Sequence, residues 1–414
     1  MGVECPDLFT KEAWSREIEP IPNLVCPEPD EILHRGELVN PKQPRTTKGR
    51  IVVIGFTIFV DDTAFVFNSR AALERALPFL QRQFARFGLL MHFGTVDPTA
   101  KTKKKRLHPS KTECMWFPAR PVKLTPADKA GKTPDEIRAM KKEITKSMVA
   151  ERIFWGDNSE FHVHYTDCFK YLGSRLVSTL SDEPEIRHKI RQATAQMHSL
   201  TNFWRSRADL QSKRFIYLAI HINTLLFGCE YWALTDLTRG LLSGFHHKSI
   251  RKILKIGMQN VKDDHIKNEH IRNRLCVDDI HEIMLSRQAN FIGRIARLPQ
   301  DRLPRQIIGS WLPTARKVGA PDATTARTMH STLTSILRLD ETTLTGNDRT
   351  EWSRYGALSA WVPMAEDRHY WKHLIQDHLA LVRRRTWQHD THTLGPPVLK
   401  DWGLAPADTE TIHI

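Results

Sequence analysis

Two adjacent aspartates, Asp61 and Asp62, lie between two apolar stretches, and this arrangement constrains the fold more than any other feature of the sequence. The flanking residues, 51–60 and 63–67, are mostly β-branched or aromatic, which is typical of paired strands. We therefore expect a hairpin that holds both carboxylates at its tip. Mg²⁺ is commonly held by one or two such carboxylates together with substrate phosphates. An Asp–Asp pair is also an ordinary hairpin turn, and both interpretations stay open at this point.

The charge of the chain points to a polyanionic partner. Lys and Arg number 61 against 47 Asp and Glu, a formal net charge of +14, which suits nucleic acid. A merely basic soluble protein remains the alternative. The six cysteines are scattered and form no Cys-x-x-Cys pair, so the sequence shows no zinc ribbon, and reduced thiols in the nucleus or cytoplasm are expected.

No membrane association is expected. The most apolar run, Phe215–Phe227, is too short for a transmembrane helix. The N-terminus also lacks the basic-then-apolar pattern of a signal peptide.

The order of patterns along the chain predicts an α+β protein. Residues 1–50 are irregular, Pro-rich and basic, whereas residues 51–180 predict a small antiparallel sheet with a covering helix, Arg70–Phe87, and basic or polar insertions. Pro78 is expected to kink that helix. Residues 181–310 predict a helical bundle, and residues 311–414 a helical tail that forms a small appendage.

Charged and titratable side chains are expected on the surfaces of these elements. Lys103, Lys104 and Lys105 lie in an insertion that forms a solvated loop or contacts phosphates. His162 and His164 share one face of a strand and could bind a metal ion, but the sequence shows no third ligand, so both are expected to be exposed. The polar sides of the bundle helices are predicted to carry His246, His247 and a set of basic residues, namely Arg187, Lys189, Arg191, Lys248, Arg251, Lys252 and Lys255.

An ordered series of motifs resembles the reverse transcriptases of non-LTR (LINE-like) retrotransposons over roughly residues 51–310. The series comprises Phe59-Val60-Asp61-Asp62, a helix ending in Gly88-Leu89, Lys111-Thr112-Glu113, Phe169-Lys170-Tyr171-Leu172-Gly173, and a basic helical region with Gly228-Cys229-Glu230-Tyr231-Trp232. Each motif alone is weak evidence, but their order and spacing are specific.

The resemblance implies a polymerase palm followed by a thumb. Asp61 would be the principal ligand of two Mg²⁺ ions, with Asp62 beside it, and Lys111 would protonate the pyrophosphate leaving group. The residues Phe169, Lys170, Tyr171, Leu172 and Gly173 would form the primer grip. The helices from about Asp182 would grip an RNA/DNA duplex, with an RNA template and dNTP substrates as further partners.

Some parts of the family pattern are not found. The family places a third carboxylate, a Gly-rich nucleotide pocket and the fingers before the hairpin, and residues 1–50 show no strand-borne Asp-x-x-x-x-Phe-Asp or Gln-Gly-x-x-Pro. We therefore expect the C-terminal part of a reverse transcriptase that needs an upstream polypeptide carrying the fingers and the rest of the palm. The alternatives are a non-catalytic nucleic-acid-binding remnant and a purely structural fragment.

Overall fold

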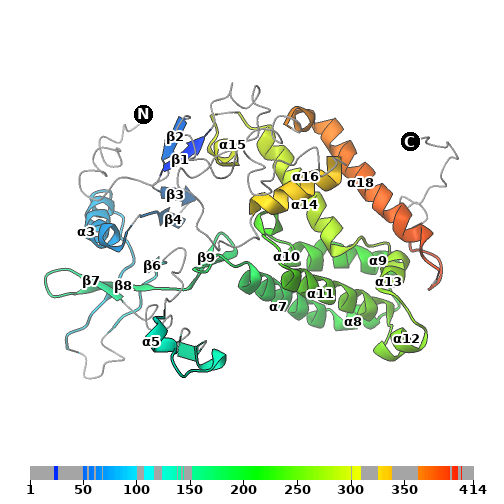
Figure 1. Ribbon diagram of the computed structural model, residues 1–414, viewed down its shortest axis with the longest axis horizontal. Coiled ribbons are helices and arrows are strands. Elements are labelled where there is room, and N and C mark those ends of the chain that lie inside the picture. Colours follow the sequence, from blue (N-terminus) through cyan, green and yellow to red (C-terminus); the bar gives the residue numbers. More distant parts are fainter. Residues whose placement is uncertain are drawn as a thin grey trace. The chain divides into compact units, whose positions relative to one another are not determined.

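The chain forms two compact units in a computed structural model. One unit comprises Met1–Leu24 and Val52–Ser181, and the other Val25–Ile51 and Asp182–Ile414. The structure describes residues 23–26, 50–53, 56–59, 62–67, 69–99, 107–115, 124–137, 139–140, 143, 152–299, 301–308, 325–337, 362–391, 394–399 and 402. The fold is α+β, as predicted, with short strands in the first unit and a mostly helical second unit (Figure 1).

The aspartate hairpin is present as β3 (Phe56–Phe59) and β4 (Asp62–Phe65). The two strands are antiparallel with Phe59 opposite Asp62, so residues 60 and 61 connect them. Such two-residue connections are the commonest in hairpins. The single strand expected over 51–60 is wrong, because β2 (Arg50–Val53) instead pairs with β1 (Asn23–Cys26).

The covering helix is α3 (Arg70–Arg86), and it begins where the sequence predicts. The Ser69 hydroxyl accepts a hydrogen bond from the Ala72 amide at 3.1 Å, the usual N-cap contact. Ala76 and Phe79 pack toward Phe65 of the hairpin, whereas Leu77 packs against the neighbouring sheet. The helix continues through Pro78 as one element.

The neighbouring sheet is mixed, with β8 at its centre. β8 (Phe161–Tyr165) pairs antiparallel with β5 (Gly94–Thr95) and β7 (Arg152–Trp155), and parallel with β6 (Glu113–Cys114). The short helix α5 (Pro126–Lys129) follows β6 in the chain.

The expected sheet shared by the aspartate hairpin and the Phe169–Leu172 strand is wrong within the described residues. β9 (Cys168–Tyr171) pairs with β10 (Ser174–Val177) as a separate hairpin. Each hairpin strand satisfies its backbone groups with the strand next to it in the chain, which closes a short loop at a lower entropic cost than a distant pairing.

The second unit is a helical bundle (Figure 1). Its first core includes Trp204, Tyr217, Leu242 and Ile250, all at most 1% exposed. Its helical elements are α7 (Glu183–Ser199), α8 (Thr201–Arg205), α9 (Leu210–Ile216), the π-helix η1 (Tyr217–Ile222), α10 (Asn223–Leu225), the 3₁₀-helix η2 (Cys229–Tyr231), α11 (Asp236–Leu254), α12 (Met258–Asp263), α13 (Asn268–Leu275), α14 (Ile280–Ala296), α15 (Leu303–Ile308), α16 (Thr325–Leu337) and α18 (Arg368–Gln388).

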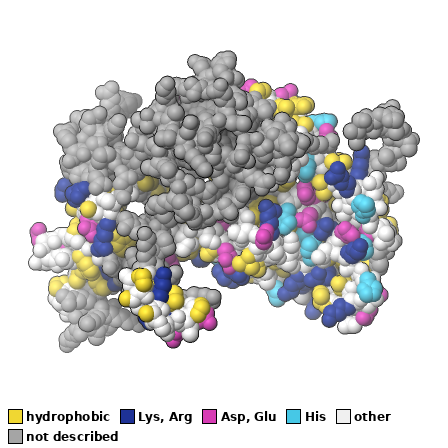
Figure 2. Space-filling model, in the orientation of Figure 1, with side chains coloured by type: hydrophobic (Ala, Val, Ile, Leu, Met, Phe, Trp, Pro, Cys, Tyr) yellow, Lys and Arg dark blue, Asp and Glu magenta, His cyan; other side chains and the backbone are white. Residues whose placement is uncertain are grey.

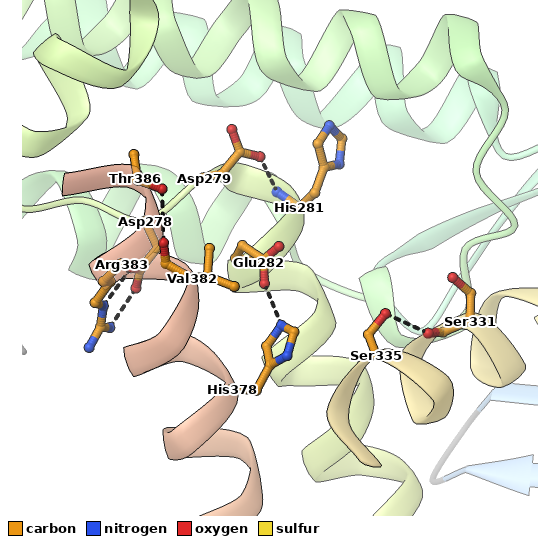
Figure 3. Close-up of polar contacts among 10 residues, drawn as sticks. All are labelled: Asp278, Asp279, His281, Glu282, Ser331, Ser335, His378, Val382, Arg383 and Thr386. Carbon is orange, nitrogen blue, oxygen red and sulfur yellow. Dashed lines mark hydrogen bonds and ion pairs between the residues drawn. The ribbon is translucent and has the colours of Figure 1, made fainter. Parts of the chain in front are cut away.

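The tail is an integral part of this bundle, so the expected appendage is wrong. α14, α16 and α18 pack on one another around Trp371, which is 1% exposed. The Arg383 guanidinium donates two hydrogen bonds of 2.7 Å to the Asp278 carboxylate, and His378 lies 2.9 Å from Glu282 (Figure 3). Buried aromatic area and polar contacts therefore both fix the tail to α14.

A close approach between α14 and α18 yields a stability prediction. The Trp371 indole donates to the Ala289 carbonyl at 2.9 Å, and a Cβ at Gly293 would lie 2.3 Å from the indole nitrogen. We expect Gly293→Ala to lower the free energy of unfolding by about 1–3 kcal/mol, as overpacking does. Gly244→Ala on α11 is the matched control, because nothing lies within 4 Å of its added methyl group. That variant should be stabilised by about 0.5–1 kcal/mol through helix propensity. Denaturant unfolding measures both, and equal shifts would contradict the packing described.

Candidate nucleic-acid interface

The catalytic residues expected from the resemblance are only partly described. Asp62 is the first residue of β4, described by its backbone alone, and Asp61 lies outside the described residues together with Lys103, Lys104 and Lys105. Lys111 is exposed, and its backbone amide donates to the His92 carbonyl at 3.2 Å. The structure thus places the Asp62 backbone at the start of β4 and Lys111 on the surface. It describes no site that joins Lys111 to the two aspartates.

The residues expected to form a primer grip make a strained, exposed turn. β9 and β10 meet at Leu172 and Gly173, whose φ angles are 48° and 84°. Positive φ at both turn positions suits the twist of a hairpin, but it is uncommon for leucine. Leu172 is also 42% exposed, while Phe169 and Tyr171 stack with ring centroids 6.3 Å apart. Non-glycine residues with left-handed backbone conformations, such as Leu172, are often found at functional sites.

The basic residues expected on α7 differ in their availability. Arg187 and Arg191 are exposed, and Arg187 donates to Glu183 at 2.7 Å. Lys189 is only 5% exposed, so its expected nucleic-acid contact is wrong. Its ammonium lies 3.5 Å from Glu185 and 4.6 Å from the centroid of the Phe227 ring. A carboxylate and an aromatic face together offset the cost of burying this cation.

The basic residues of α11 form part of a surface. Lys248 is exposed, and Arg251 is half-buried one turn further along the same side of the helix. Lys252 is half-buried and donates to the Met197 carbonyl at 3.2 Å and to the Thr201 hydroxyl at 3.4 Å. It therefore neutralises the C-terminal end of α7, where a cation is favourable.

Sequence reasoning missed Arg205 and Arg207 of this surface, whereas it placed Lys255 on the polar side of α11, where Lys255 is found. Arg205, Arg207 and Lys255 are exposed, and Lys255 donates to the Arg205 carbonyl at 3.3 Å, which joins the end of α11 to α8. For Arg205 and Arg207, the sequence signal was the basic pattern Trp204-Arg205-Ser206-Arg207 at the end of a helix. Together they define the α8–α11 basic surface: Arg205, Arg207, Lys248, Arg251 and Lys255. Figure 2 shows Lys and Arg gathered at the lower right, where Figure 1 has α8, α11 and α12.

The two histidines expected on the polar side of α11 are buried, and that prediction is wrong. His246 is 0% exposed, with Nδ1 at 2.9 Å from the Tyr217 hydroxyl and Nε2 at 3.1 Å from the Asp278 carbonyl. A carbonyl only accepts, so Nε2 carries the proton and Nδ1 accepts from Tyr217. Burial lowers the pKa of His246 to about 3, with the neighbouring His247 adding to the effect.

His247 is held neutral in the same way. Its Nε2 lies 2.8 Å from the Arg272 guanidinium, which only donates. Burial is the main reason that its pKa falls to about 4, and the Arg272 charge is the next.

The strand histidines of the first unit also differ from expectation. His162 is 2% exposed beneath Gly94, where any Cβ would lie 2.2 Å from its ring, and burial lowers its pKa. His164 lies 3.1 Å from Glu113. The prediction that both are exposed is therefore wrong for His162, and Glu113 of the Lys-Thr-Glu motif has a structural partner.

The described residues do not build a two-ion centre. Two Mg²⁺ ions need carboxylates on both sides, and across the described ranges no group of three or more His, Cys, Asp or Glu side chains lies close enough to hold a metal ion. Asp61 and the side chain of Asp62 lie outside the described residues.

Comparison with known proteins identifies no relative of this chain. No protein-family model, curated protein or solved structure is significantly similar to this chain. Among the described residues, no helix is long and apolar enough to cross a membrane.

The buried histidines predict a pH dependence of stability. Each histidine has a pKa near 6.5 in the unfolded chain and a lower pKa in the folded chain, so it does not reduce stability above about pH 6.5. As the pH drops from there toward 4, the unfolded chain takes up the proton first, and the free energy of unfolding falls. We expect the free energy of unfolding to fall by up to about 1.4 kcal/mol per pH unit for each histidine. His247→Gln keeps an acceptor for Arg272 and should flatten this slope in denaturant unfolding between pH 7 and 4. An unchanged slope would show that His247 does not titrate as described.

Proposed function

We propose that this chain contributes the palm hairpin and thumb of a reverse transcriptase of the non-LTR retrotransposon type. One observation carries the proposal: the motifs that resemble the family occupy elements suited to the implied roles, in the implied order. The aspartate hairpin leads into α3, the Phe169–Gly173 segment forms an exposed turn, and a helical bundle with a basic surface follows.

The proposed partner is an RNA template paired with a DNA primer. Arginine and lysine side chains on the α8–α11 basic surface, with Arg187 and Arg191 of α7, would contact phosphates. A-form helices offer shape, phosphates and 2′-hydroxyls rather than readable base edges. The contacts would therefore be largely independent of base sequence.

Catalysis by this chain requires a complementary polypeptide under the proposal. Asp61 and Asp62 would supply one side of the metal site, Lys111 a proton for the leaving group, and Phe169 to Gly173 the grip on the primer end. Because residues 1–50 show no strand-borne Asp-x-x-x-x-Phe-Asp motif, the third ligand would come from the partner. The same observation favours a second candidate, a non-catalytic nucleic-acid-binding protein that uses the basic surface alone.

Binding is tested through its salt dependence. Each phosphate contact adds about 0.9 to the slope of log affinity against log salt, so Lys248→Gln with Arg251→Gln should reduce that slope by about 2 and weaken duplex binding at every salt concentration. Lys129→Gln with Lys132→Gln removes the same charge from exposed positions near α5 of the other unit and should leave the slope unchanged. Fluorescence anisotropy with an RNA/DNA duplex measures both variants. Equal effects would show that net charge, rather than this surface, governs binding.

Catalysis is tested by primer extension. We expect the 414-residue chain not to extend a DNA primer on RNA with Mg²⁺ or Mn²⁺, because displacing a catalytic group by about 1 Å already costs on the order of a hundredfold. Extension should appear when a fragment carrying the third carboxylate and the nucleotide pocket is added, and Asp61→Asn should abolish it. Extension by the chain alone, lost in Asp61→Asn, would contradict the need for a partner.

A further inference from the structure

A groove on the helical unit lies beside the π-helix. It has a volume of about 430 Å³ and runs between the segment of α9, η1 and α10 on one side and the link 276–279 with α14 on the other. Leu218, Ile222, Val277 and Ile283 give it an aliphatic lining, and Phe215 stands at its edge with 66% of its surface exposed. An aromatic ring left this open on a helix gains little from burial in the described fold.

The groove also carries fixed positive charge. The Arg214 guanidinium is half-buried and donates from Nε to the Cys276 carbonyl at 2.8 Å, and within the described chain its terminal amino groups make no hydrogen bond. Burial lowers the pKa of Arg214, so its remaining donors face a partly dehydrated space. One guanidinium edge is therefore anchored while the other is available for a planar, bidentate anion.

The other charged groups of the groove leave it net positive. Arg287 donates to the Asn223 side chain and, at 3.5 Å, to the Leu226 carbonyl. The carboxylate of Asp278 accepts both hydrogen bonds of Arg383, so its charge is compensated (Figure 3). Arg214 and Arg287 therefore give the groove a net positive charge.

The backbone beside the groove is unusual. η1 is a π-helix over Tyr217–Ile222, a conformation that is rare and frequent at functional sites. Its inward side chains, Tyr217 and His221, are fully buried, whereas Leu218 and Ala219 line the groove. The core contacts therefore hold the groove wall in place.

We propose that this groove binds an unpaired nucleotide of a single-stranded RNA or DNA, with the base stacked on Phe215 and the phosphate bound by Arg214 and Arg287. The inference rests on the proposed function as a nucleic-acid-binding chain and adds a site for unpaired strand. Stacking on exposed aromatic rings within a basic groove is the usual mode of binding single strands. The volume suits a small ligand, whereas a docked peptide helix needs a longer groove that accepts side chains over two turns.

The test compares two exposed phenylalanines. Phe215→Ala should weaken binding of a labelled twelve-nucleotide oligo(U), measured by fluorescence anisotropy, by roughly five- to a hundredfold, the loss expected for one stacked base. Phe87→Ala removes a ring that is also exposed, at 49%, but does not line the groove, and should have no such effect. Arg214→Lys keeps the charge but loses the bidentate edge, and should also weaken oligo(U) binding. None of the three should change the affinity for an RNA/DNA duplex.

The outcomes separate this inference from the proposed function. Duplex binding together with oligo(U) binding that is insensitive to both Phe215→Ala and Arg214→Lys would overturn the nucleotide site and leave the proposed function standing. A chain that binds neither nucleic acid would overturn both. Binding of an amphipathic Glu/Leu peptide with no binding of oligo(U) would overturn the site in favour of a protein partner.

Discussion

A buried hydrogen-bond chain through the helical unit sets the geometry on which the rest of that unit depends. The Tyr217 hydroxyl, the His246 ring and the Asp278 carbonyl link η1, α11 and the start of α14 across an apolar core. Losing one partner would leave a buried polar group unsatisfied, at a cost of about 1–3 kcal/mol. The chain also fixes His246 as a neutral tautomer, so this side of α11 faces the core and carries no charge.

Because the side of α11 that carries His246 packs in the core, the basic residues of this helix face solvent or the ends of neighbouring helices. Lys252 and Lys255 each donate to a backbone carbonyl, one near the end of α7 and one at the end of α8, while Lys248 remains exposed. Lys213 is buried and donates to the Ser206 carbonyl at 2.9 Å, and burial followed by the Lys255 charge lowers its pKa. Part of the positive charge of the chain therefore stabilises helix ends, and a smaller part is available to phosphates.

Local sequence patterns predicted the positions of the helices and strands well, but they did not predict which polar side chains are buried. The hairpin, the Ser69 cap of α3 and the helical second half follow from residue patterns over a few turns. Lys189, His162 and His246 are buried by residues distant in the chain. Lys189 also pairs with the local Glu185, but it is covered by the Phe227 ring, and the sequence around these residues does not show their burial. Strand pairing failed for the same reason, since β9 alone does not specify whether it pairs with β10 or with the aspartate hairpin. The groove beside η1 joins residues 214–223 to 276–287, which only folding brings together.

Cross-linking tests most directly whether the helical unit contacts nucleic acid through the α8–α11 basic surface. An RNA/DNA duplex carrying photoreactive groups along its backbone would be bound, irradiated and digested, and the attached peptides identified by mass spectrometry. The proposed thumb predicts cross-links on peptides from α8 and α11, reduced by unlabelled duplex, with further links near the Leu172–Gly173 turn for groups at the primer end. Cross-links confined to other helices of the bundle, or spread evenly over the basic residues of both units, would contradict it.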